Sequence, residues 1–252
     1  MTRFDFTDKV VLVAGASRGI GEAVSHGFAE HGATVICSSR KQADCEKVAE
    51  KIREKGGKAI SAELHLGNLD HQENILTLIK SKFGRLDVLI NNGATSPHFG
   101  PAHEASEAAF DKTIQVNTRG PYFLSTKSFP LLKENGGGAI INVASIDGIQ
   151  PAEFRVIYGM SKAALIAMTK GLAKEYSQHG VRVNALLPGF TDTKLASALK
   201  DNPAMDIYVK MNLAVKRMAQ PEEMVGAVLY MASQEASYYT GQSMIVDGGA
   251  VI

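Results

Sequence analysis

The side chains with the clearest chemical potential are a tyrosine and a lysine four positions apart, Tyr158 and Lys162. The segment from 158 to 170 has helical composition and periodicity, which places both side chains on one helix face about one turn apart. A nearby ammonium favours the phenolate and lowers the pKa of a phenol from its usual value of about 10, which makes the tyrosine a usable general acid. Because this spacing also occurs on many surface helices, its interpretation depends on the rest of the chain.

Length and composition are those of one α/β domain with a sizeable core: 252 residues, 45% hydrophobic and 21% charged. The 27 basic residues balance 26 acidic ones without long runs, so no nucleic acid or anionic membrane surface is indicated as a partner, and a small-molecule substrate is expected. Two cysteines, Cys37 and Cys45, are too few for a disulfide framework or a cysteine-based metal site. Charges in residues 1–9 argue against a signal peptide, and no stretch reaches the roughly 18 apolar residues of a membrane span, so we expect a cytoplasmic protein.

Short β-branched stretches alternate with helical patterns along the chain. Strands are predicted at residues 10–14, 34–37, 58–63, 87–90, 139–143, 181–186 and 243–246, and helices at residues 19–31, 42–55, 70–83, 106–135, 158–178 and 221–233. The order predicts one domain over residues 1–252, a Rossmann-type doubly wound parallel sheet of about seven strands with helices on both faces. Ligands of such sheets bind at the carboxyl ends of the strands.

A glycine-rich loop follows the first predicted strand, with Gly15, Gly19 and Gly21 in the sequence Gly-Ala-Ser-Arg-Gly-Ile-Gly. Glycines allow a tight turn and a close approach of the backbone to a pyrophosphate, and the N–H groups of the following helix face the anion. The spacing departs from the G-x-G-x-x-G fingerprint, and a glycine-rich turn alone can be mere loop geometry. A strand before it and a helix after it nevertheless favour dinucleotide binding.

The end of the second predicted strand indicates which dinucleotide is bound. An NAD enzyme usually places a carboxylate about 20 residues after the glycine loop, but this chain has Ser39 and Arg40. An arginine can pair with a 2′-phosphate in a bidentate fork, and Arg18 could approach the same group. NADP(H) is therefore favoured, with NAD(H) as the alternative, although an arginine at a strand end is commonly just solvated.

With these motifs in place, the chain resembles the classical short-chain dehydrogenases/reductases from Lys9 to Gly249. The further motifs that carry the resemblance are Asn91-Asn92-Gly93-Ala94, Asn117, Ser145, Tyr158 with Lys162, the turn from Pro188 and Gly189 to Thr193, Thr240-Gly241, and Val246-Asp247-Gly248-Gly249. Within the family, Ser38-Ser39-Arg40-Lys41 and His65-Leu66-Gly67 are most similar to the NADPH-dependent carbonyl and retinal reductases of the dehydrogenase/reductase member 4 type.

The resemblance implies an oxidoreductase that transfers a hydride between NADP(H) and a carbonyl or alcohol, or an NAD-dependent alcohol dehydrogenase as the alternative. Tyr158 would donate a proton to the carbonyl oxygen and Ser145 would stabilise that oxygen. Lys162 would hold the nicotinamide ribose and lower the tyrosine pKa, and Asn117 would bind a water that relays protons, or simply bridge a helix break. The implied cofactor contacts are Gly15, Ser17, Arg18, Gly19, Ile20, Gly21, Ser39, Arg40, Leu66, Asn92, Gly93, Ala94, Tyr158, Lys162, Pro188, Gly189, Thr191 and Thr193.

The sequence departs from the family pattern in three ways. Ala14 replaces a common threonine and so lacks a hydroxyl that ties neighbouring turns together, while Gly93-Ala94 inverts the usual order, a change we expect the backbone to absorb. His65 stands where an aspartate usually contacts the amino group of adenine. That contact is therefore not expected here, and Leu66 would provide apolar contact with the adenine. Since no companion ligands surround His65 in the sequence, we expect no metal.

The substrate pocket is predicted to be mostly apolar, which favours a hydrophobic ketone, aldehyde or 3-oxoacyl group, although ordinary packing would explain the same residues. Its candidate walls are Ser96, Pro97, His98, Phe99, Ile146, Ile149, Phe154, Phe190, Leu195 and Leu199. Residues 190–216 are expected to cover the substrate. The resemblance also implies a homotetramer, paired through the helices around Asn117 and Tyr158 and through the C-terminal strands.

Two rival classes of function remain at this stage. A non-catalytic nucleotide-binding regulator would not need the set of Asn117, Ser145, Tyr158 and Lys162. A relative that catalyses dehalogenation, dehydration or epimerisation would not need an intact nucleotide loop together with Arg40.

Overall fold

The computed structural model, which describes residues 4–194 and 203–252, is built around a seven-stranded sheet in the order β3-β2-β1-β4-β5-β6-β7. Every neighbouring pair is parallel. The strands are β1 (Val10–Ala14), β2 (Thr34–Ser39), β3 (Lys58–Glu63), β4 (Val88–Asn91), β5 (Gly138–Val143), β6 (Val181–Pro188) and β7 (Ser243–Val246). The predicted doubly wound, Rossmann-type sheet is confirmed.

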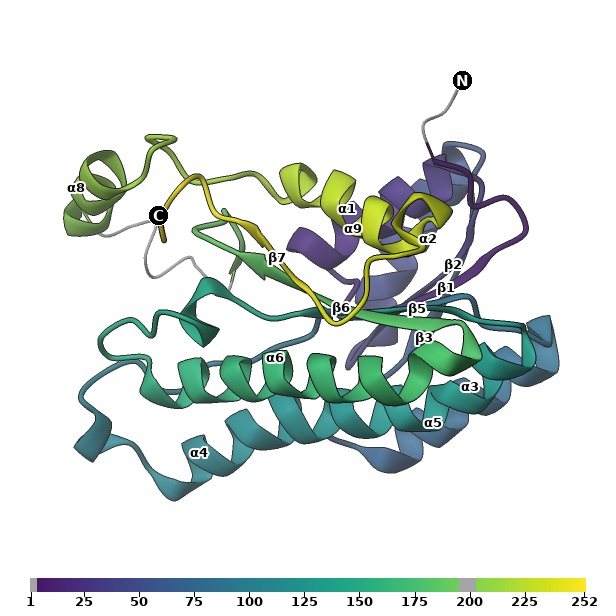
Figure 1. Cartoon of the computed structure of the whole chain (residues 1–252), viewed down its shortest axis with the longest axis horizontal. Helices are drawn as coiled ribbons and strands as arrows, with labels where there is room; N and C mark the ends of the chain where they lie inside the picture. The colour runs from purple at the N-terminus through teal and green to yellow at the C-terminus, as the bar shows by residue number, and fades with distance from the viewer. Residues whose placement is uncertain (1–3, 195–202) are drawn as a thin grey trace.

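Helices cover both faces of the sheet (Figure 1). One face carries α1 (Gly19–Glu30), α2 (Gln42–Glu54) and α9 (Val225–Ala232), and the other carries α3 (Leu69–Phe83), α4 (Glu107–Ile114), α5 (Gly120–Glu134) and α6 (Val156–Tyr176). The strands read as continuous apolar stretches because successive side chains enter opposite cores: Val11 and Val13 pack with the first layer, and Leu12 with the second. None of the described helices is long and apolar enough to cross a membrane.

The helical stretch predicted at 106–135 is present, but it is not one regular α-helix. The chain forms α4, then a π-helical turn at Gln115–Arg119, and then α5. Pro121 lacks an N–H, so it cannot donate to the carbonyl of Asn117 four residues earlier, and an ordinary α-helical ladder cannot run through this point. The break places Asn117, which is buried, between the two helices.

Other element boundaries differ slightly from prediction. Strands β2 and β6 extend to Ser39 and Pro188, which places both residues at the carboxyl edge of the sheet. The last predicted helix opens as a 3-10 turn, Pro221–Met224, before α9 begins. Part of the predicted substrate-covering segment forms α8 (Pro203–Asn212), and Leu195 and Leu199 lie outside the described residues.

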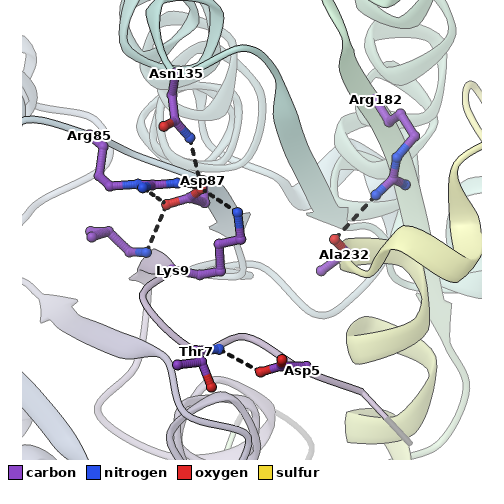
Figure 2. Close-up of polar contacts among 9 residues, drawn as sticks. Asp5, Thr7, Lys9, Arg85, Asp87, Asn135, Arg182 and Ala232 are labelled. Atoms are coloured by element: carbon purple, nitrogen blue, oxygen red, sulfur yellow. Dashed lines mark hydrogen bonds and ion pairs between the residues drawn. The ribbon is translucent and has the colours of Figure 1, made fainter.

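A polar cluster ties the opposite, amino edge of the sheet together (Figure 2). The buried carboxylate of Asp87, just before β4, accepts hydrogen bonds from the Val10 N–H at 2.9 Å, from Arg85 at 2.7 and 2.9 Å, and from Asn135 at 2.7 Å. The Lys9 ammonium lies 3.4 Å away. Burial opposes ionisation, but the hydrogen bonds from Arg85, Val10 and Asn135 lower the pKa of Asp87, so it is charged at neutral pH. This cluster therefore lies at the edge of the sheet opposite the carboxyl ends of the strands.

Candidate active site

One cavity lies at the carboxyl edge of the sheet, where the chain order reverses between β1 and β4. It gathers all of the cofactor contacts predicted from the sequence except Gly21, together with the predicted catalytic residues except Asn117. The predicted residues that line it are Gly15, Ser17, Arg18, Gly19, Ile20, Ser39, Arg40, Leu66, Asn92, Gly93, Ala94, Ser145, Tyr158, Lys162, Pro188, Gly189, Thr191 and Thr193.

The glycine loop leaves room that only glycines permit. Gly15 has φ +94°, and a Cβ atom there would lie 2.5 Å from the Gly93 nitrogen. The Gly15 N–H donates to the Ser38 carbonyl at 2.7 Å, and Asn92 Nδ2 donates to the Gly15 carbonyl at 2.8 Å. Gly21 lies behind the loop, where a Cβ would collide with the Gly15 carbonyl. The loop therefore presents bare backbone at the N-terminus of α1, which fits the pyrophosphate of a dinucleotide.

The hydroxyl missing at Ala14 is compensated by other bonds between the strand ends. The Ala14 carbonyl accepts the N–H groups of Asn92 and Gly93 at 3.0 and 2.8 Å, and Ser38 Oγ donates to the Val13 carbonyl at 2.9 Å. A Cβ at Gly93 would lie 2.8 Å from the end of the Leu66 side chain, and its contacts with the backbone of Ala14 and Gly15, at 3.7 Å, would be ordinary ones. The inverted Gly-Ala order therefore widens the cavity beside Leu66 without requiring a special backbone conformation.

The end of the cavity near β2 and β3 is basic. His65 Nδ1 accepts the Gly67 N–H at 3.0 Å, and Lys112 of α4 lies 3.2 Å from Nε2. Burial and the charges of Lys112 and Arg40 lower the pKa of His65, so its ring is neutral at pH 7. The sequence reasoning missed Lys112, which lies 47 residues away in the chain and reaches this end only through the fold.

Tyr158 and Lys162 lie in the first turns of α6, one turn apart as predicted, and both are buried. Lys162 Nζ donates to the Val143 carbonyl at 2.7 Å and lies 5.5 Å from the centroid of the Tyr158 ring. Burial lowers the pKa of Lys162 to about 7. Burial also raises the pKa of Tyr158, while Arg155 and Ser145 act to lower it. The Lys162 ammonium lies beside the ring of Tyr158, and its role in lowering the phenol pKa stays a prediction.

Ser145 and Asn117 hold neighbouring segments in place. Ser145 Oγ accepts the Asp147 N–H at 3.1 Å, which caps the short 3-10 turn after β5 and leaves the hydroxyl on the cavity wall. The Asn117 amide accepts the Thr95 N–H and donates to the Thr95 carbonyl, both at 2.8 Å, and donates to Ser161 Oγ at 3.1 Å. Asn117 thus bridges the helix break to the loop after β4 and to α6.

A buried ion pair beside Tyr158 was not found from the sequence. Arg155, at the N-terminus of α6, lies with its Nη1 2.8 Å from Asp147 Oδ2, and both side chains line the cavity. Burial raises the pKa of Asp147, and Arg155 and Lys162 oppose that rise. The available signal was an arginine three residues before the tyrosine and an aspartate two residues after the serine.

The predicted apolar wall is only partly assembled. Ile146 and Phe190 line the cavity, and the Phe190 ring lies 5.8 Å from that of Tyr208 in α8. Phe99 and Phe154 contact each other at 6.2 Å but are 59% and 46% exposed, and neither lines the cavity. Within residues 4–194 and 203–252, no group of three or more His, Cys, Asp or Glu side chains could hold a metal ion.

Comparisons with known proteins agree with this geometry. A family model described as enoyl-(acyl carrier protein) reductase matches residues 15–251. Dehydrogenase/reductase SDR family member 4 of Bos taurus is 34% identical over 244 residues, which cover 97% of this chain and 88% of that protein. The resemblance stated from the motifs is thereby confirmed.

Two solved structures extend the comparison. A gluconate 5-dehydrogenase from Burkholderia cenocepacia J2315, in complex with NADP and tartrate, has a TM-score of 0.95 at 26% identity, covering 98% of this chain and 97% of that one. A 7α-hydroxysteroid dehydrogenase complexed with NADH and 7-oxoglycochenodeoxycholic acid has a TM-score of 0.93 at 26% identity, covering 97% of this chain and 95% of that one. The chain belongs to the classical short-chain dehydrogenase/reductase family and is an NAD(P)-dependent oxidoreductase acting on CH–OH groups.

Proposed function

We propose that the chain transfers a hydride between NADP(H) and a carbonyl or alcohol substrate, reducing a hydrophobic ketone, aldehyde or 3-oxoacyl group. The observation that carries the proposal is that Ser145, Tyr158 and Lys162 line the same cavity as the glycine loop. A nucleotide-binding regulator would have no need for this set of side chains beside the nucleotide site.

Tyr158 acts as the general acid in the proposed reaction. Its phenol donates a proton to the carbonyl oxygen of the substrate, and Ser145 donates a hydrogen bond to the same oxygen as negative charge develops there. Bound nicotinamide supplies the hydride for the carbonyl carbon. In the oxidation direction, the Tyr158 phenolate takes the proton of the alcohol hydroxyl.

Lys162 and Asn117 support the acid. Lys162, with a pKa of about 7, can gain or lose a proton at neutral pH, which suits both a hydrogen bond to a ribose hydroxyl and the return of a proton to Tyr158. The Asn117 side chain is occupied by Thr95 and Ser161. A relay water would therefore be bound by the backbone of the π-helical turn, where the carbonyl of Asn117 has no donor in Pro121.

The preference for NADP(H) rests on charge at the adenosine end of the cavity. Arg18, Arg40 and Lys112 line it together with a neutral His65, and no carboxylate that could pair with a ribose 2′-hydroxyl is among the described lining residues near β2. The relatives bind either cofactor: NADP occupies the gluconate 5-dehydrogenase and NADH the hydroxysteroid dehydrogenase.

Residues 190–216 are proposed to cover the substrate, in keeping with the contact between Phe190, which lines the cavity, and Tyr208 of α8. A homotetramer is proposed as well, in keeping with exposed apolar side chains on α4, α5 and α6: Phe110 at 40%, Tyr122 at 45% and Met160 at 51%. Light scattering coupled to gel filtration measures the molar mass of the protein in solution and so the number of chains in the assembly.

The near-ultraviolet absorbance of NADPH, followed with a panel of apolar ketones, aldehydes and 3-oxoacyl thioesters, tests the function. We expect NADPH consumption at a rate set by the carbonyl compound, and a lower kcat/KM with NADH. Binding of NADPH without consumption by any carbonyl compound would favour a regulator. Turnover of a substrate without any change in the nucleotide would favour an elimination or epimerisation.

A further inference from the structure

The ion pair of Asp147 and Arg155 lies directly against the ring of Tyr158. The Arg155 Cζ atom is 4.4 Å from the ring centroid, closer than the Lys162 ammonium at 5.5 Å. The Asp147 carboxylate forms an ion pair with the guanidinium at 2.8 Å, and the Arg155 and Asp147 side chains are only 18% and 7% exposed. The guanidinium is therefore fixed in place rather than free to sample the solvent.

The residue before Arg155, at the start of α6, has an unusual backbone conformation. Phe154 has φ +64°, an unfavourable conformation for a residue with a bulky side chain. Its carbonyl accepts the Gly100 N–H at 3.1 Å, and its ring packs against Phe99 at 6.2 Å. The Arg155 carbonyl accepts the Gly159 N–H at 2.9 Å, the first bond of the helical turn that carries Tyr158. The strained turn thus orients Arg155 and Tyr158 as one unit.

Among the described residues, four groups lie around the Tyr158 phenol. Arg155 and Lys162 come from α6 and its N-terminus, and Asp147 and Ser145 come from the turn after β5. Lys162 directs its Nζ to the Val143 carbonyl and loses its charge near neutral pH. A guanidinium does not deprotonate in proteins. Arg155 is therefore the cation beside the phenol whose charge persists across the working pH range.

We propose that Arg155, anchored by Asp147, is a positioning residue that stabilises the phenolate of Tyr158 when the enzyme oxidises an alcohol. The proposal rests on the proposed role of Tyr158. Arg155 exchanges no proton with the substrate: the alcohol proton goes to the phenolate oxygen, and the hydride goes to the nicotinamide. The arginine acts on the phenol through charge and through contact with the ring.

Titration of the phenol tests this without turnover. The ultraviolet absorbance change on tyrosine ionisation is measured as a function of pH for the wild type and for Arg155→Met. The same titration is repeated with Tyr158→Phe added to each protein, and the difference between the two curves is the titration of the Tyr158 phenol alone. We expect Arg155→Met to raise the midpoint by about one pH unit or more. Arg155→Lys should raise it by less, because a positive charge is retained. Arg155→Gln replaces Arg155→Met in the comparison if the methionine variant does not fold.

Arg53→Met is the matched control, because Arg53 forms a surface ion pair with Glu46 at 2.6 Å on α2, away from the cavity. It should leave the midpoint unchanged. An unmoved midpoint in Arg155→Met, or an equal shift in Arg53→Met, would overturn the proposal. Since no substrate or cofactor is present, this outcome is independent of whether NADPH is turned over.

The pH profile of kcat/KM for alcohol oxidation provides a second readout. Oxidation needs the phenolate, so a higher phenol pKa moves the rising limb of the profile to higher pH. Arg155→Met should therefore lose roughly tenfold or more in kcat/KM below that limb and recover at alkaline pH. A loss of the same size at every pH would indicate a purely structural role and contradict the proposal.

Discussion

At the scale of single residues, the site combines a buried phenol with two cations of different character. Lys162 is buried and has a pKa of about 7, whereas Arg155 carries a permanently charged guanidinium that is paired with the Asp147 carboxylate. Tyr158 and Lys162 are recognisable in the sequence because their spacing and the family motif coincide. Arg155 is not, because its pairing with Asp147 depends on a turn in which Phe154 adopts a positive φ, and no local pattern predicts that conformation.

Lys162→Met is expected to change the pH dependence of stability. The Lys162 pKa is about 7 when folded and 10.5 ordinarily, so the unfolded chain binds more protons between these values and the wild type loses stability as the pH falls through this range. Below about pH 7, the burial of Lys162 destabilises the folded wild type by its full amount. Relative to the wild type, Lys162→Met should therefore be more stable at about pH 6 than at about pH 10, by a difference on the order of a few kcal/mol.

Calorimetric unfolding of the two proteins at both pH values measures this difference. If the variant and the wild type differed by the same amount at about pH 6 and about pH 10, Lys162 would not titrate in the range that its burial indicates.

At the scale of elements, the strands and their order could be predicted from the sequence, whereas the π-helical turn within the predicted helix could not. Three strands, residues 10–14, 58–63 and 243–246, have the predicted bounds, because β-branched stretches are flanked there by clear turn residues. The π-helical turn at Gln115–Arg119 was missed, because periodicity over 106–135 continues through it. The interruption follows from the proline at 121 and from tertiary contacts of Asn117, which sequence periodicity does not register.

The glycine loop supports a prediction with an internal control. Gly15 and Gly56 both have positive φ, +94° and +84°, so an alanine at either position is strained by roughly 1–2 kcal/mol. Only at Gly15 would the added Cβ also meet backbone, whereas nothing lies within 4 Å of it at Gly56. Gly15→Ala should weaken NADPH binding at least about tenfold, and Gly56→Ala should leave it unchanged.

Fluorescence titration of NADPH with each variant provides the comparison, and thermal unfolding of both measures how much the backbone contact at Gly15 adds to the strain that the two positions share. Equal NADPH affinity in the two variants would mean that the loop after β1 is not the nucleotide cradle.

At the scale of the whole molecule, the two edges of the sheet have different roles. The carboxyl edge carries the cavity, and the amino edge carries the Asp87 cluster (Figure 2). Asp87 joins β1, β4 and the C-terminal end of α5 through Val10, Arg85 and Asn135. Neutralising or removing its carboxylate leaves buried donors without an acceptor.

Asp87→Ala is expected to lower the free energy of unfolding by about 1–3 kcal/mol, since the buried Val10 N–H loses its acceptor, whereas the side chains of Arg85 and Lys9 are 36% and 40% exposed and can turn to solvent. The control is Asp5→Ala. Asp5 is exposed, and in Figure 2 its carboxylate is drawn with one hydrogen bond, from the Thr7 N–H at 2.9 Å. That variant should unfold almost as the wild type does. Urea denaturation of the three proteins measures both effects, and similar midpoints for all three would contradict the structural role of Asp87.

The same cluster predicts acid sensitivity. The folded pKa of Asp87 is depressed, so its contribution to stability is present above the ordinary value of 3.8 and is lost as the pH falls through the folded pKa. Below that value the difference in stability between Asp87→Ala and the wild type should shrink.

The measurement that tests the central claim most directly is the rate of NADPH oxidation by Tyr158→Phe with a carbonyl substrate that the wild type reduces. The variant keeps the buried ring and loses only the proton donor. We expect kcat to fall by roughly 10² to 10⁴, the contribution of general acid catalysis, while NADPH still binds. Near-normal turnover by Tyr158→Phe would show that Tyr158 does not protonate the substrate.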